Sequence, residues 1–159
     1  MLADLLKQLS DVKGLEWIRL HYAYPHKFPL EVLDVMRERE NICNYLDMPL
    51  QHAANNMLKA MKRQITREEM EELIVAVREK VPGICLRTTL IAGFPGETQD
   101  DVEELKMFLQ KQRFDRVGIL HTHMKKQHLL MILLMMCRRM KRREEHRKLW
   151  KCSRKFLMN

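Results

Sequence analysis

The chain has 159 residues, which is enough for one domain with a sizeable core. Its formal net charge is +8, but residues 119–159 hold 12 of the 29 Lys and Arg residues and only 2 of the 21 acidic residues, which leaves 17 basic and 19 acidic residues in 1–118. The basic character therefore belongs to the tail, and the charge balance of residues 1–118 argues against a nucleic-acid-binding module there.

The cysteines and the hydropathy of the sequence indicate the cellular compartment in which we expect the protein. The four cysteines are too far apart to form a metal-binding knuckle: Cys43, Cys85, Cys137 and Cys152. Free cysteines without an export signal are typical of the reducing cytoplasm. The longest apolar run, residues 129–137, is too short to span a bilayer. We therefore expect a cytoplasmic protein with no membrane partner.

The hydrophobic pattern predicts helices that alternate with strands. Leucines at helical spacing and capping residues predict helices over 2–12, 30–39, 55–62, 66–80 and 99–112. Runs of β-branched and apolar residues predict strands over 15–24, 42–50, 86–92 and 115–120. Strict alternation with crossover helices implies an α/β fold with a parallel sheet.

Residues 86–98, LRTTLIAGFPGET, are the most informative stretch. The apolar strand ends at Gly93, and Thr98 is a good N-cap for the next helix, whose acidic first turn suits the helix dipole. In α/β folds ligands bind in the loop after a strand's carboxyl end, and glycines let a ligand approach the backbone. On spacing alone, a plain turn between a strand and a helix is the favoured interpretation, because two glycines three positions apart are a weak signal.

The amino-acid sequence of residues 86–98 resembles the fifth-strand motif of the radical S-adenosylmethionine (SAM) methylthiotransferase family. The resemblance covers residues 1–120 and implies a partial radical SAM (β/α)6 barrel, with strands three to six only and helices outside the sheet. It implies SAM as cofactor and places Ile91 and Gly93 against its adenosine, with Glu97 among the binding residues. The segment 47–52, DMPLQH, resembles the fourth-strand motif of the family.

Two more residues are expected to bind SAM. Gln51 has two donors and an acceptor that suit its polar groups. Arg87 is a natural partner for its carboxylate, although a structural ion pair explains an arginine there equally well.

The segment 20–25, LHYAYP, indicates the substrate class. Within the family, a Tyr-x-Tyr-Pro sequence here resembles the branch that modifies an aspartate of the small-subunit ribosomal protein uS12, whereas the branch that modifies tRNA differs. Tyr22 and Tyr24 would then face the substrate, together with His52. The alternatives are that the tyrosines pack structurally and that His52 is a pocket wall or a capping residue.

The chain lacks the motif with which the family's chemistry begins. Three thiolates of a Cys-x-x-x-Cys-x-x-Cys loop hold a 4Fe-4S cluster in the family, and these ligands are absent from the 159 residues. We expect no metal ligand and no catalytic residue in this chain, which we interpret as an inactive fragment. The alternatives are a tRNA methylthiotransferase of the same family and a non-enzymatic basic nucleic-acid-binding module.

The tail, residues 121–159, has no counterpart in the family and is interpreted as an out-of-frame translation. The codons for Met and Trp both end in G. If the third base of each codon is read together with the first two bases of the next codon, seven residues of the shifted frame are fixed: six acidic residues and one valine. Permitted choices elsewhere give an acidic sequence resembling the family's continuation. On this interpretation the tail carries no selected function.

Overall fold

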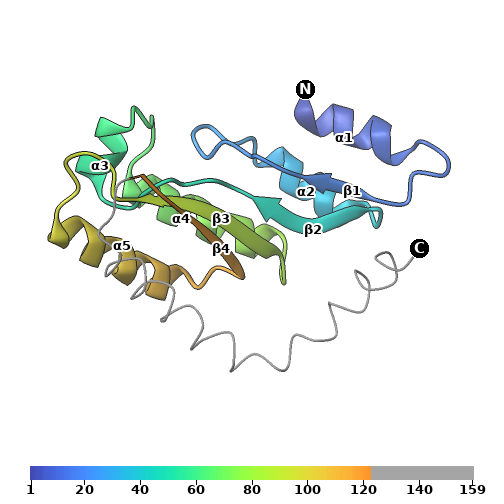
Figure 1. Cartoon of the computed structure of the whole chain (residues 1–159). Helices are drawn as coiled ribbons and strands as arrows, with labels where there is room; N and C mark the ends of the chain where they lie inside the picture. The colour runs from blue at the N-terminus through green and yellow to red at the C-terminus, as the bar shows by residue number, and fades with distance from the viewer. Residues whose placement is uncertain (123–159) are drawn as a thin grey trace, which may run out of the picture. The chain divides into compact units, whose positions relative to one another are not determined.

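The computed structural model describes residues 1–122 (Figure 1). The tail that we interpret as an out-of-frame translation, residues 121–159, lies almost entirely outside the described residues. The described residues alternate between helices and strands in this order: α1 (Leu2–Ser10), β1 (Ile18–Leu20), α2 (Glu31–Glu38), β2 (Ile42–Asp47), α3 (Asn55–Ala60), α4 (Arg67–Lys80), β3 (Cys85–Ala92), α5 (Gln99–Gln112) and β4 (Arg116–His121). The predicted α/β class is confirmed.

The four strands form one sheet in the order β1-β2-β3-β4, and each neighbouring pair is parallel. The β3–β4 register runs without a break from Arg87 beside Arg116 to Ala92 beside His121. Because all strands point the same way, their carboxyl ends meet at one edge of the sheet. Residues that follow β1, β2 and β3 are therefore brought together there.

The core lies on one face of the sheet. Along β3, Leu86, Leu90 and Ala92 are buried, while the alternate residues are only half-buried. The buried side packs against residues of the crossover helices, including Val32 and Met36 of α2, Met70 and Ile74 of α4, and Leu105 and Phe108 of α5. On the opposite face β3 carries the half-buried residues Cys85, Arg87, Thr89 and Ile91.

The N-terminal caps of α4 and α5 agree with the sequence prediction. Thr66 and Thr98 each accept a hydrogen bond from the backbone three residues later, and Glu69 and Asp101 complete the two capping boxes. The strands differ more from expectation. β1 is only three residues long instead of ten, because its pairing with β2 is irregular and Tyr22 takes a positive φ of 57°. β2 ends at Asp47, before Pro49, which has no N–H for the ladder.

Candidate functional site

The carboxyl edge of the sheet brings Gln51 and Ile91 side by side. The Gln51 N–H donates to the Thr89 carbonyl at 3.0 Å, and the Ile91 N–H donates to the Gln51 carbonyl at 2.7 Å. Gln51 adopts a positive φ of 74°, an uncommon conformation for a residue other than glycine. Two residues predicted independently as SAM ligands are thus joined by backbone hydrogen bonds.

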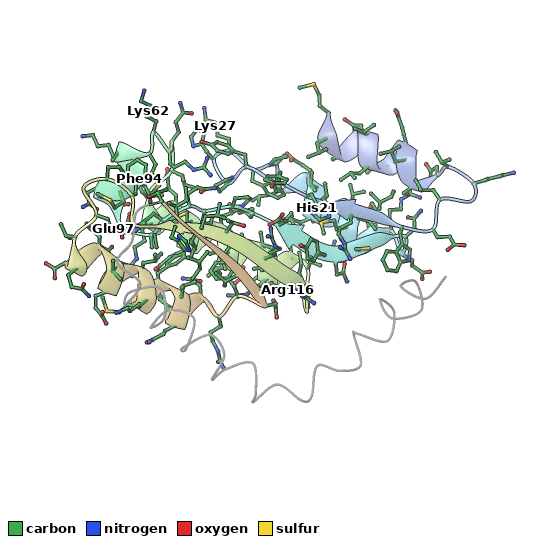
Figure 2. All side chains as sticks on the ribbon, viewed as in Figure 1. His21, Lys27, Lys62, Phe94, Glu97 and Arg116 are labelled. Carbon is green, nitrogen blue, oxygen red and sulfur yellow. The ribbon has the colours of Figure 1, made fainter. Side chains whose placement is uncertain are left out.

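A hollow of about 380 Å³ opens beside this pair. Its lining combines apolar, amide and basic side chains: Gln51, Ala60, Met61, Lys62, Arg63, Ile91 and Phe94. In Figure 2, Lys62 and Phe94 lie at the end of the sheet where β3 ends, whereas Arg116 marks the start of β4. A larger hollow, about 550 Å³, lies between α4 and α5, away from the strand ends. We take the smaller hollow as the candidate site, because ligands bind α/β folds at the carboxyl edge.

Arg63 is a lining residue that the sequence analysis missed. It donates from its guanidinium to the Pro49 carbonyl at 2.8 Å and lies over the ring of Tyr24, 5.1 Å from the ring centre. Its buried Nε has no hydrogen-bond partner among the described residues. A buried donor of this kind is costly unless a ligand or water satisfies it. No sequence signal distinguishes Arg63 from the other basic residues around it.

Uncommon backbone conformations gather at the same edge. Tyr22, Gln51 and Lys62 all have positive φ values between 55° and 74°. Such conformations cost free energy and are found preferentially at functional sites. Tyr22 is 81% exposed and Tyr24 is 44% exposed, so both rings are accessible from solvent. That they face a substrate stays a prediction.

Glu97 is used within the glycine loop. Its Oε2 accepts the Gly93 N–H at 2.7 Å, and its Oε1 lies 3.0 Å from His52 Nε2. The loop itself turns at Gly93 and Gly96, which have φ values of 79° and 88° that glycine adopts without strain. Both carboxylate oxygens of Glu97 therefore have protein partners, which favours a role in shaping the loop over direct contact with a cofactor.

His52, which the sequence predicts to face a substrate, lies inside the protein, and a substrate contact for it stays a prediction. The side chain is fully buried, with 0% exposure, and its Nδ1 accepts the Ala54 N–H at 3.0 Å. The imidazole is therefore closed off from solvent in this structure. Of the alternatives open from the sequence, a capping role agrees best with the geometry.

Arg87 forms an ion pair with Asp47, the alternative that the sequence left open. The two side chains project from neighbouring positions of β3 and β2, and Arg87 Nη1 lies 2.7 Å from Asp47 Oδ1. The hydrogen bond that Arg87 donates to Asp47 raises the pKa of the guanidinium above its ordinary value. Asp47 is almost completely buried, whereas the Arg87 side chain is 36% exposed. That Arg87 also binds the SAM carboxylate stays a prediction.

The described residues contain no group of three or more His, Cys, Asp or Glu side chains that could hold a metal ion. Cys43 and Cys85, which the structure places on β2 and β3, are free thiols, and burial raises the pKa of Cys85. No helix within residues 1–122 has the length and hydropathy of a membrane span.

This parallel sheet with helices on one face, and a hollow at its carboxyl edge, agrees with the family comparison. The model of the radical SAM superfamily matches residues 1–109, and the chain belongs to this superfamily. The predicted resemblance is confirmed.

The similarity to curated proteins is more specific than the superfamily match. The chain is 59% identical over 128 residues to the ribosomal protein uS12 methylthiotransferase RimO of Cytophaga hutchinsonii, covering 77% of this chain and 29% of the relative. It is 56% identical over 118 residues to RimO of Bacteroides thetaiotaomicron, with 74% and 27% covered, and 48% identical over 132 residues to that of Flavobacterium johnsoniae, with 82% and 30% covered. The chain thus spans less than a third of the length of these relatives.

Solved structures support the fold. Coproporphyrinogen III oxidase (HemN) from Escherichia coli, a radical SAM enzyme, matches with a TM-score of 0.61 at 20% identity, over 85% of this chain and 34% of that one. The radical SAM methyltransferase TsrM from Kitasatospora setae matches with a TM-score of 0.59 at 21% identity, over 75% and 24%. At these identities the likeness establishes the partial radical SAM fold alone.

Proposed function

We propose that residues 1–122 form the adenosyl-binding side of a radical SAM methylthiotransferase. The whole enzyme adds a methylthio group to the β-carbon of an aspartate in ribosomal protein uS12. The observation that carries the proposal is the hollow formed by Gln51 and Ile91, in a chain 48–59% identical to RimO proteins. A ribosomal substrate also implies a cytoplasmic location.

The lining of the hollow fits SAM. Ile91 and Phe94 offer apolar surface for an adenine ring, while the Gln51 amide offers donors and an acceptor for its polar edge or for the ribose. The Nε of Arg63, which has no hydrogen-bond partner within residues 1–122, offers a donor for a ligand oxygen. SAM supplies the radical chemistry of the proposed reaction, and these residues bind and orient it.

A 4Fe-4S cluster does not fit the described residues, because Cys43 and Cys85 are the only cysteines among them and three thiolates are needed. We derive no catalytic step through a cluster held by this chain. Tyr22 and Tyr24 line the mouth of the site in the proposal, with Arg63 holding the Tyr24 ring in place.

Binding of SAM to the full chain tests the first part of the proposal. We expect equilibrium dialysis with labelled SAM to detect binding, and Gln51→Ala and Ile91→Ala each to weaken it about tenfold, the loss of one buried hydrogen bond or apolar contact. Val75→Ala is the matched control, because Val75 is 51% exposed on α4. Absence of binding, or equal weakening by the control, would refute the proposal.

A chimera tests the substrate. Residues 1–118 would replace the matching segment of Cytophaga hutchinsonii RimO, which is 59% identical. Reconstituted with its clusters, the chimera should add one methylthio group to uS12, seen by mass spectrometry of the tryptic peptides, and should leave tRNA unmodified. Modification of tRNA instead would favour the alternative of a tRNA methylthiotransferase.

A further inference from the structure

His52 and Glu97 form a buried pair between two loops that are far apart in sequence. The side chain of His52 has 0% exposure and that of Glu97 has 5%. His52 follows Gln51 directly, and Glu97 lies in the loop after β3 that contains Gly93 and Phe94. The two residues are separated by 45 positions, so their contact ties together the loops that line the hollow. In Figure 2 Glu97 lies near Phe94, at the same end of the sheet.

The backbone fixes the tautomer of the imidazole. The Ala54 N–H donates to His52 Nδ1 at 3.0 Å, so Nδ1 carries a lone pair. The ring proton of the neutral imidazole is therefore on Nε2, which donates to Glu97 Oε1 at 3.0 Å. The direction of each hydrogen bond is thus determined by one backbone amide.

Glu97 connects His52 to the loop that contains Gly93. While Oε1 accepts from His52, Oε2 accepts the Gly93 N–H at 2.7 Å. A carboxylate offers an acceptor on both oxygens, whereas an amide offers one acceptor and one donor, so glutamine cannot satisfy both partners. The Glu97 N–H in turn donates to the Phe94 carbonyl at 2.9 Å, which closes the turn through Pro95 and Gly96 that follows Gly93.

From this geometry we infer that His52 is a positioning residue, which acts through Glu97 to hold the Gly93 amide and so the loop beside the hollow. The chain of hydrogen bonds runs from Ala54 through His52 and Glu97 to Gly93 and makes the two loops one preformed unit. The identity of the ligand that benefits from this order, SAM, rests on the proposed function. His52 itself touches no ligand.

Two substitutions at His52 separate this role from simple packing. Both His52→Asn and His52→Gln replace the ring by a smaller uncharged amide. The Asn oxygen replaces Nδ1 as acceptor for Ala54 but leaves no donor for Glu97, whereas the Gln nitrogen reaches the position of Nε2 and keeps that donor. Hydrogen exchange of the Gly93 amide in the full chain, resolved by fragmentation mass spectrometry, reports on the far end of the unit.

We expect His52→Asn to speed exchange at Gly93 by about 10- to 100-fold, the effect of losing a hydrogen bond to a charged group, and His52→Gln to stay near the wild-type rate. Asp100→Asn is the control: it removes a charge from the exposed first turn of α5 without touching the unit, and should leave the rate unchanged.

Equal acceleration by both His52 variants would show that only packing matters and would overturn the inference, as would an unchanged rate in His52→Asn or an equal effect in Asp100→Asn. The measurement is made without SAM. Failure of the chain to bind SAM would therefore count against the proposed function alone.

Discussion

Removal of Arg87 should destabilise the protein through the carboxylate that it leaves behind. Asp47 has a side-chain exposure of only 2% and receives its short hydrogen bond, 2.7 Å, from Arg87. In Arg87→Ala the buried carboxylate keeps one side-chain partner within residues 1–122, His21, whose Nδ1 is 3.7 Å away. Breaking a fully buried pair costs about 3–5 kcal/mol. Because the Arg87 side chain is 36% exposed and water reaches that face, we expect about 2–3 kcal/mol.

The double variant shows where this cost arises. Asp47→Asn combined with Arg87→Ala removes the buried charge as well as its partner, so it should recover at least about 1 kcal/mol relative to Arg87→Ala alone. Arg87→Lys keeps a cation and should cost less than Arg87→Ala. The measurement is urea unfolding of the full chain followed by circular dichroism, with a constant m-value. If the single and double variants are equally unstable, the buried charge is not the cause.

Thr98→Ala should lower the free energy of unfolding by about 1 kcal/mol, because the hydroxyl accepts from the Asp101 N–H and caps α5; Thr98→Ser should restore most of it in the same urea assay. Asp101 gives a pH dependence: burial acts to raise its pKa, but hydrogen bonds from Thr98 and Asn56 outweigh burial and lower it. The stability it contributes is fully present above its ordinary value of 3.8 and is lost as the pH falls through the lowered pKa, so Asp101→Asn should flatten the acid side of a stability–pH curve; an unchanged curve would contradict this. Reconstitution with iron and sulfide should leave the chain without a stoichiometric 4Fe-4S cluster, and a cluster absorbance lost on substitution of Cys43 and Cys85 would contradict that expectation.

The fold was largely predictable because its signals are local. Thr66 and Thr98 cap their helices through residues only three positions away, so the sequence contains both partners. The alternation of helices and strands likewise predicts a parallel sheet with short-range crossovers. β1 was overestimated, since residues 15–17 and 21–24 have strand-like composition but do not belong to the strand. Pairing with a neighbour decides that outcome, and composition does not record it.

The sequence by itself determined which residues stand at the carboxyl edge. Gln51 and Ile91 follow from parallel strands whose ends meet at one side of the sheet, and Gly93 from the turn that must come after β3. Only the tertiary structure decided what those neighbours do. Three contacts join residues that are 39 to 45 positions apart: Arg63 over the Tyr24 ring, the Asp47–Arg87 pair, and His52 buried against Glu97. Side-chain partners at that separation depend on how helices and strands pack in three dimensions, and a linear pattern of residue types does not contain that packing.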